Sequence, residues 1–253
     1  MTLAEVPTRI VYSRPEVLDK RVTHYCPGCT HGVAHRLVAE VLEEMGEVEN
    51  AIGVASVGCS VFIYNYFNID FVEAAHGRAP AMATGIKRLL PDRTVFTYQG
   101  DGDLASIGMG EIVGAASRGE KITVIFLNNA NYGMTGGQMA PTTLPGQKTT
   151  SSPYGKDAAR FGKPFRIEDA YSGFDMGYLA RGALVGAANI NRAKKMIRKA
   201  FEKHMDNQGL CYVELLSPCP TNWNLAPLKA KDFLLEEMTK HFPLGEFKGG
   251  DAK

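Results

Sequence analysis

One stretch of the sequence limits the possible fold more than any other. Thr94–Tyr98 and Ile122–Leu127 are short apolar runs typical of buried strands, and Leu104–Ser117 between them has the pattern of a helix. Two strands joined by one crossover helix form a βαβ unit, in which the strands run parallel. The sequence therefore predicts a sheet with parallel strands.

The rest of the chain continues the alternation of strands and helices. Helices are predicted at Gly32–Met45, Pro80–Leu90 and Arg192–Met205, and strands at Ala51–Val57, Tyr178–Leu184 and Leu210–Leu216. This pattern favours an α/β fold with a mainly parallel sheet flanked by helices. No linker or repeat divides the sequence, so we predict one domain over residues 1–253, with an N-terminal arm (about 1–22) and a C-terminal extension (about 225–253).

Composition excludes several classes of protein. The chain has 253 residues, of which 45% are apolar and 22% charged, which is typical of a globular domain. Its net charge of +1 gives no reason to expect binding to nucleic acid or to an anionic membrane. No segment approaches the roughly 18 consecutive apolar residues of a membrane-spanning helix, and the N-terminus lacks the pattern of a signal peptide. We therefore expect a cytoplasmic protein.

An acidic, glycine-containing loop follows the first strand of the βαβ unit. Residues 100–105, GDGDLA, fit the relaxed dinucleotide motif GxGxxG/A, and Glu120 lies near the distance expected for a ribose ligand. Asp101 and Asp103, however, would place two carboxylates where a pyrophosphate must approach, and these charges repel. Because Mg²⁺ commonly bridges protein carboxylates to phosphates, the loop predicts a metal-diphosphate site rather than a bare dinucleotide site.

Further metal ligands are expected at the end of the next strand. That strand ends at Asn128-Asn129, and the ends of neighbouring parallel strands meet at the edge where open α/β sheets bind ligands. Their amides can complete an oxygen shell with Asp101, and the turn at 130–133 can add a carbonyl. The simpler alternative is that both asparagines cap a turn and that Asp101 caps a helix.

The five cysteines divide into four candidate ligands and one other. Cys26 and Cys29 form a CPGC motif before a helix, which suits a thiol redox pair, half of a zinc site or half of an iron–sulfur site. Cys59 and Cys219 each follow a predicted strand at the same sheet edge. Cys211 lies inside a strand, where a free cysteine is most often a small buried hydrophobe. We predict a four-thiolate site and favour an iron–sulfur centre, with zinc and unrelated thiols left open.

Six motifs together resemble a known family. They are YCPGCTHG at 25–32, VGCS at 57–60, HGRAPAMATGIK at 76–87, GDGD at 100–103, NNANYGMTGGQ at 128–138 and SPCPTNW at 217–223. In this order they resemble the β subunit of 2-oxoacid:ferredoxin oxidoreductases, the pyruvate, 2-oxoglutarate and 2-oxoisovalerate synthase family. The resemblance implies a domain that binds thiamine diphosphate, Mg²⁺ and one [4Fe–4S] cluster. It also implies oxidative decarboxylation of a 2-oxoacid to acyl-CoA and CO₂, with electrons passed to ferredoxin.

The resemblance also implies roles for individual residues. Asp101 and Asn129 would bind Mg²⁺ through their side chains and Asn131 through its carbonyl. His76 would lie near the cofactor, as a tentative catalytic residue or as a structural one. The cluster ligands would be Cys26, Cys29, Cys59 and Cys219, and the other cofactor-binding residues Gly58, Cys59, Ser60, Gly100, Gly102, Asp103, Gly133 and Met134. We expect His24, His31 and His35 to be structural or exposed.

The implied partners are an α subunit holding the aminopyrimidine half of the cofactor, ferredoxin, coenzyme A and a small 2-oxoacid, with γ and δ subunits as open candidates. Phe62 replaces a lysine of some relatives, which tilts the expected substrate weakly from 2-oxoglutarate toward a branched-chain 2-oxoacid such as 2-oxoisovalerate. The basic run Arg192–Lys203 suits a solvated helix face or ferredoxin docking. The loop 134–155 suits a surface excursion, a lid or a subunit contact.

Two alternative functions stay open: a non-redox thiamine-diphosphate lyase with a structural zinc site made by four cysteines, and a CPGC thiol-redox protein.

Overall fold

The computed structural model describes residues 11–250, so part of the predicted N-terminal arm lies outside the described residues. One seven-stranded sheet runs through it in the order β2-β1-β3-β4-β6-β5-β7, and all neighbouring pairs are parallel except β5 and β7. The strands are β1 (Ala51–Ala55), β2 (Asp70–Glu73), β3 (Thr94–Gly100), β4 (Thr123–Asn128), β5 (Tyr178–Ala183), β6 (Cys211–Leu216) and β7 (Gly245–Lys248). The predicted α/β fold with a mainly parallel sheet is confirmed.

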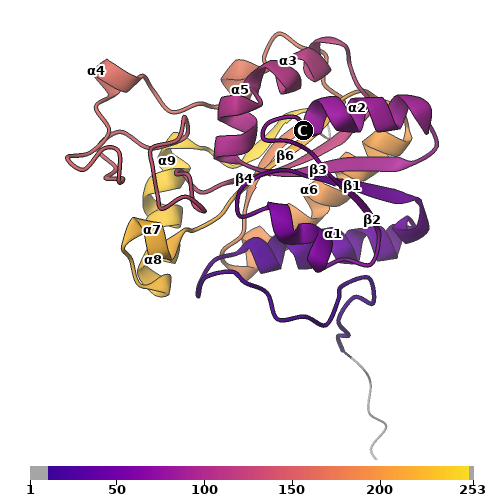
Figure 1. Ribbon diagram of the computed structural model, residues 1–253, viewed down its shortest axis with the longest axis horizontal. Helices are drawn as coiled ribbons and strands as arrows, with labels where there is room; N and C mark the ends of the chain where they lie inside the picture. The colour runs from indigo at the N-terminus through magenta and orange to yellow at the C-terminus, as the bar shows by residue number, and fades with distance from the viewer. Residues whose placement is uncertain (1–10, 251–253) are drawn as a thin grey trace, which may run out of the picture.

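Helices cover both faces of the sheet (Figure 1). One face carries α1 (His31–Met45) and α6 (Ala187–Met205), and the other carries α2 (Ala79–Leu89), α3 (Met109–Ser117) and α5 (Ile167–Ala170). Strand residues alternate between the two resulting cores: Phe96 packs on the α1 side and Val95 on the α2 side. A sheet covered on both faces needs apolar residues at consecutive strand positions, which explains the unbroken apolar runs.

The C-terminal segment folds back over the carboxyl ends of the strands. It contains α7 (Pro220–Trp223), α8 (Pro227–Phe233), the π turn η4 (Leu234–Met238) and α9 (Thr239–His241), followed by β7. Its apolar side chains form a third buried cluster with Ala130, Leu144 and Leu216. The predicted extension is thus packed against the sheet edge where the site was expected.

Several element boundaries differ from those predicted. The strands β2 and β7 were not predicted, and the helix expected at 104–117 begins as a π turn, η3 (Asp103–Ile107), before α3. Gly108 separates the two because a Cβ there would lie 2.6 Å from the Asp103 carbonyl oxygen and 2.9 Å from that of Gly77. The helix α6 begins five residues earlier than predicted, at Ala187, and β1 ends earlier, at Ala55.

Short elements connect the larger ones. These are the 3-10 turns η1 (Val48–Asn50) and η2 (Val61–Asn65) and the four-residue helix α4 (Ala158–Phe161). The segment that carries α4 stands out from the sheet in Figure 1. Within residues 11–250, no helix combines the length and apolar character needed to cross a membrane.

Candidate active site

A cavity opens at the carboxyl edge of the sheet, beside the ends of β1, β3 and β4. Most of the predicted cofactor-binding residues line it. They are Gly58, Cys59, Ser60, His76, Gly100, Asp101, Gly102, Asp103, Asn129, Gly133 and Met134. Asn131 is not in the lining, but it is buried in the same loop as Asn129. The topology therefore brings together loops that are far apart in the sequence, since Gly58 and Met134 line one cavity.

Asp101 is a buried carboxylate that accepts hydrogen bonds. Among residues 11–250, no positively charged side chain forms an ion pair with it. One oxygen accepts from the Gly102 N–H at 2.9 Å and the other from the Thr142 hydroxyl at 2.7 Å. Burial raises its pKa to about 7, and these hydrogen bonds oppose the rise. A cation in the cavity would hold the carboxylate ionised, so Asp101 fits a Mg²⁺ ligand.

The loop after β4 offers further oxygen atoms. The Asn131 N–H donates to Asn129 Oδ1 at 3.3 Å, and Asn131 Nδ2 donates to the Asn129 carbonyl at 3.1 Å. The remaining Asn131 Oδ1 is buried and has no hydrogen-bond partner among the described residues. An orphaned buried oxygen is costly, and a bound cation is one way to satisfy it. The Asn131 side-chain oxygen thus fits a bound cation, whereas the Asn131 carbonyl and the Asn129 side chain stay predicted ligands.

Asn128 does not share this role. Its Nδ2 donates to Glu214 at 2.6 Å, and its Oδ1 accepts from the Ala130 N–H at 3.0 Å. The amide of Asn128 therefore faces the core and caps the turn, as the simpler alternative had it.

Asp103 lines the cavity, but its carboxylate is fully engaged by the protein. Its Oδ1 accepts from Ser56 Oγ at 2.8 Å, the Gly77 N–H at 2.6 Å and His76 Nδ1 at 2.5 Å, and its Oδ2 accepts from Gln99 at 2.5 Å. These contacts give Asp103 a positioning role, and its predicted place beside the diphosphate stays a prediction. It fixes the ring of His76, whose Nδ1 donates to the carboxylate and leaves Nε2 for other contacts.

The four predicted ligand cysteines come from three loops that meet beside the cavity. Cys26 and Cys29 precede α1, Cys59 follows β1 and Cys219 follows β6. Burial, followed by the neighbouring thiols of Cys219 and Cys29, raises the pKa of Cys59 to about 12. The hydroxyls of Thr30 and Ser217, 2.8 Å apart, join two of these loops.

The spacing of the thiols bears on what they can hold. Among the described residues, no three His, Cys, Asp or Glu side chains are placed to bind a single metal ion. A zinc site needs four thiolates at about 2.3 Å from one atom, whereas a [4Fe–4S] cluster spreads its cysteines over four irons. Both groups are held by cysteine thiolates, so the iron–sulfur centre and the zinc alternative stay predictions at this point.

Comparison with known proteins identifies the family. The C-terminal TPP-binding domain of thiamine pyrophosphate enzymes matches residues 56–215. The chain is 34% identical over 231 residues to the 2-oxoglutarate synthase subunit KorB of Archaeoglobus fulgidus, covering 91% of this chain and 80% of KorB. The chain belongs to the 2-oxoacid:ferredoxin oxidoreductase family of thiamine pyrophosphate enzymes.

Other members of this family differ in length. The chain is 47% identical over 244 residues to the ketoisovalerate oxidoreductase subunit VorA of Methanothermobacter thermautotrophicus, covering 96% of this chain. It spans only 51% of VorA. The 2-oxoglutarate:ferredoxin oxidoreductase of Magnetococcus marinus has the same fold, with a TM-score of 0.76 at 23% identity over 97% of this chain and 88% of the solved one.

Some residues around the cavity were missed by sequence reasoning. Thr142 holds Asp101, the Trp223 indole donates to the Asn129 carbonyl at 3.0 Å, and Tyr132 lines the cavity. The Tyr132 ring lies so close to Gly102 that it leaves no room for a Cβ at that position. Tyr132 and Trp223 belong to the recognised motifs and could have been found there, whereas Thr142 lies in an aperiodic loop without a signal.

The histidines and Cys211 largely follow expectation. His31 and His35 are buried and His24 is exposed. His31 in addition lines the cavity, with its Nδ1 2.9 Å from the Tyr98 hydroxyl. Cys211 is buried within β6, and its thiol contacts the Gly209 carbonyl at 3.6 Å.

Glu120 corrects the dinucleotide hypothesis. It precedes β4, at the sheet edge opposite the cavity, and pairs with Arg88 at 2.6 Å and Arg118 at 2.7 Å. It therefore cannot bind a ribose at this site.

Two further expectations find no support in the site geometry. Phe62 packs edge-on against His24, with ring centroids 4.8 Å apart, and does not line the cavity. On the basic run, Lys194 and Arg198 face the acidic Glu44 of α1. Because α1 supplies counter-charges, the run has less positive charge to offer a docking partner than its sequence suggests.

Proposed function

We propose that this chain is the cofactor-binding subunit of a 2-oxoacid:ferredoxin oxidoreductase. The reaction converts a 2-oxoacid anion and coenzyme A to acyl-CoA and CO₂, releasing two electrons and one proton. The electrons would leave through a [4Fe–4S] cluster to ferredoxin. We expect it to act in the cytoplasm, where exposed thiols stay reduced.

One observation carries this proposal: the metal loop and the cysteine set meet at Gly133. A Cβ on Gly133 would lie 3.3 Å from the Cys59 sulfur and 3.5 Å from Asn129 Nδ2. A structural zinc site has no reason to lie against a cofactor, whereas a redox centre must be close to the reacting group. This contact favours the oxidoreductase over a non-redox lyase.

The residues present suit the implied groups. Asp101, Asn129 and Asn131 would hold Mg²⁺ at the diphosphate, and Cys26, Cys29, Cys59 and Cys219 would hold the cluster. When bound, thiamine diphosphate supplies the electron sink for decarboxylation. His76, oriented by Asp103, would hold or release a proton at Nε2 within the cavity.

Substrate and partners are part of the same proposal. The VorA relative is a ketoisovalerate oxidoreductase subunit, which favours a branched-chain 2-oxoacid as substrate. An α subunit would hold the aminopyrimidine half of the cofactor, with γ and δ subunits as additional components.

The decisive experiment is anaerobic purification of the complex, followed by iron and sulfide analysis and ferredoxin reduction with a panel of 2-oxoacids and coenzyme A. We expect iron and sulfide in equal amounts and the fastest reduction with 2-oxoisovalerate. Zinc without iron would instead support the lyase alternative.

Two variants distinguish the proposed function from a CPGC thiol-redox protein. Cys26→Ser should lose iron and ferredoxin reduction while it keeps Mg²⁺-dependent binding of thiamine diphosphate. Asp101→Ala should show the reverse, with the cluster retained and thiamine diphosphate binding lost. A thiol-redox protein would respond to Cys26→Ser but would not bind thiamine diphosphate at all.

A further inference from the structure

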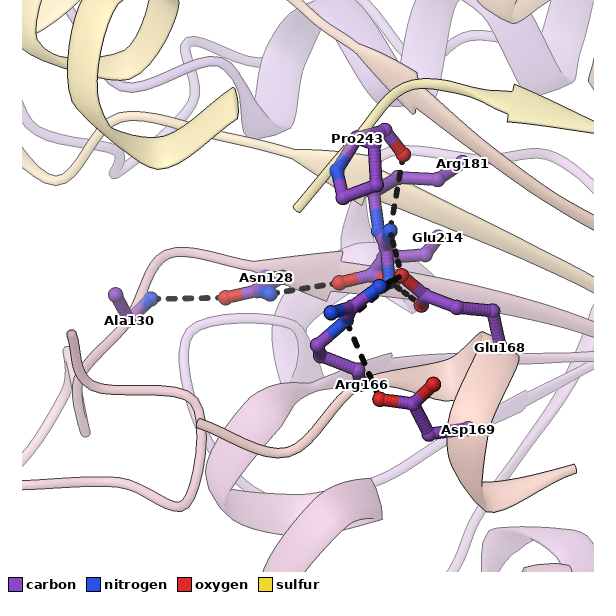
Figure 2. Close-up of polar contacts among 8 residues, drawn as sticks. All are labelled: Asn128, Ala130, Arg166, Glu168, Asp169, Arg181, Glu214 and Pro243. Carbon is purple, nitrogen blue, oxygen red and sulfur yellow. Dashed lines mark hydrogen bonds and ion pairs between the residues drawn. The ribbon is translucent and has the colours of Figure 1, made fainter. Parts of the chain in front are cut away.

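A buried chain of polar contacts runs from the core to the loop that carries the metal-ligand candidates (Figure 2). Arg181 on β5 donates to Glu214 on β6 at 2.6 Å, and the other Glu214 oxygen accepts from Asn128 at 2.6 Å. Asn128 in turn accepts from the Ala130 N–H at 3.0 Å. Arg181 is also held by Glu168 of α5 and by the Pro243 carbonyl.

Stability alone does not account for these charges. The side chains of Arg181 and Glu214 are 0% and 1% exposed, on two neighbouring interior strands whose other positions are mostly apolar. Removing two charges from water costs several kcal/mol each, and buried ion pairs are often no more stabilising than apolar side chains of the same size. A second role for the pair is therefore worth seeking at the end of the contact chain.

That end is a strained residue. Ala130 has φ of 58°, in the left-handed region, and the other two described non-glycine residues with positive φ are asparagines. Asparagine adopts this conformation more readily than alanine, so contacts with the surroundings are needed to hold Ala130 there. Its N–H is held by Asn128, and its carbonyl accepts from Thr143 at 2.6 Å.

The charge of Glu214 decides which way the Asn128 amide faces. A carboxylate only accepts hydrogen bonds, so Asn128 must point its NH₂ group at Glu214 and its oxygen at the Ala130 N–H. With glutamine at 214, the amide oxygen would serve Arg181 and the NH₂ group would face Asn128. Asn128 would then have to turn its oxygen away from Ala130.

We propose that Glu214, held by Arg181, is a positioning residue for the metal loop (residues 128–134). By fixing the Asn128 amide it keeps Ala130 left-handed, which turns Asn129 and Asn131 on either side of it toward the cation. This inference rests on the proposed function for the identity of the cation, but the loop geometry that it describes exists without one.

The test is Glu214→Gln in the purified complex, with two readouts. Hydrogen exchange of the amides of residues 128–134 is measured without Mg²⁺ or thiamine diphosphate, and the Mg²⁺ dependence of thiamine diphosphate binding is measured by calorimetry. We expect faster exchange in this loop and a Kd for Mg²⁺ raised about 10-fold, as for other residues that orient metal ligands. Glu120→Gln is the matched control, because Glu120 is also a buried glutamate with arginine partners but lies at the opposite sheet edge.

Two more variants keep the result interpretable if Glu214→Gln folds poorly. Asn128→Ala cuts the contact chain while leaving the Arg181–Glu214 pair intact, and it should give the same two effects. Adding Ala130→Gly should recover most of the lost Mg²⁺ affinity, because glycine adopts positive φ without strain. A merely structural role for the network predicts no such recovery.

The outcomes separate this inference from the proposed function. Unchanged loop exchange and Mg²⁺ dependence in Glu214→Gln and Asn128→Ala, whatever their thermal stability, would overturn the positioning role. Failure of the unaltered complex to bind Mg²⁺ with thiamine diphosphate would overturn the proposed function, while the exchange measurement would still decide whether Glu214 holds the loop.

Discussion

His204 on α6 is a buried histidine surrounded by polar groups from other segments. Its Nε2 lies 3.1 Å from Lys87 Nζ and 3.4 Å from the Val95 N–H, and its Nδ1 lies 3.3 Å from the Thr123 hydroxyl. Burial, followed by the charge of Lys87, lowers the pKa of His204 to about 4. The ring is therefore neutral in the folded chain at pH values where it is protonated in the unfolded chain.

This difference predicts loss of stability in mild acid. As pH falls from about 6.5 to about 4, His204 binds a proton in the unfolded state but stays neutral in the folded state. The free energy of unfolding therefore decreases over this range. At about 1.4 kcal/mol per pKa unit, His204 contributes at most roughly 3 kcal/mol. Denaturant unfolding at about pH 7 and about pH 4.5 should show a smaller acid-induced loss in His204→Gln than in the unaltered chain. The control His241→Gln should keep the full loss, and equal losses in both variants would contradict the prediction.

The two classes of cysteine should respond differently to the same substitution. Cys219→Ala removes a proposed cluster ligand whose sulfur accepts from Asn222 at 3.3 Å, so most of the bound iron should be lost. Cys211→Ala removes only a small buried side chain in β6, so iron content should stay within error of the unaltered protein. Iron analysis of anaerobically purified samples measures both, and equal iron in the two variants would remove Cys219 from the ligand set.

At the residue scale, much of the candidate site could be predicted because its chemistry is carried by polar residues that follow buried strands. Asp101 and Asn129 follow predicted strands, and parallel topology places such positions at one edge. What each side chain faces could not be predicted. Asn128 and Asp103 have oxygen atoms that could bind a ligand. In the folded chain, however, their side chains bond to residues from other segments, such as Glu214 for Asn128 and Gln99 for Asp103.

At the scale of elements, the loop after β4 is anchored by a buried lysine that bonds to backbone carbonyls. The ammonium group of Lys156 donates to the Thr143 carbonyl at 2.9 Å and lies 3.5 Å from the Pro141 carbonyl. These carbonyls flank Thr142, which holds Asp101. The lysine therefore connects the projecting segment to the proposed metal site.

Removal of this anchor should loosen the segment. Lys156→Met deletes both contacts, so limited proteolysis between residues 144 and 157 should be roughly 10-fold faster, in proportion to the more populated open state. Lys148→Met is the control, because Lys148 lies in the same loop and makes neither of these two contacts. Equal cleavage rates for the two variants would show that Lys156 does not anchor the segment.

Element prediction succeeded where both faces of a strand or one face of a helix are buried. The interior strands have unbroken apolar runs, and α1 has helical spacing ended by the left-handed Gly46. The edge strand β2 is mostly exposed and acidic, and β7 is short and half-exposed, so neither has an apolar pattern to detect. The π turn η3 follows from close packing of Gly108 on Gly77, a contact between distant segments that local sequence cannot reveal.

At the scale of the whole molecule, the proposed site is one-sided. The cavity is bounded by the loops after β1, β3 and β4, and all of the proposed Mg²⁺ and cluster ligands come from this side. The thiamine pyrophosphate family match covers residues 56–215 as one binding domain, and the chain spans only 51% of VorA. The proposed function places the aminopyrimidine half of thiamine diphosphate on an α subunit.

Because only one side of the active site lies on this chain, we predict that the chain alone binds its metal groups but does not convert 2-oxoacids. Purified anaerobically without partners, it should hold its iron yet reduce ferredoxin at least about 10²-fold more slowly than the complex, because a general acid or base that activates the cofactor contributes about 10²–10⁴-fold. Adding the separately purified partner should restore the rate at unchanged iron content. Equal iron in both samples ensures that a slow rate reflects the absent half of the site and not a lost cluster. Turnover of 2-oxoacids by the chain alone, at a rate close to that of the complex, would show that the whole active site lies within these 253 residues.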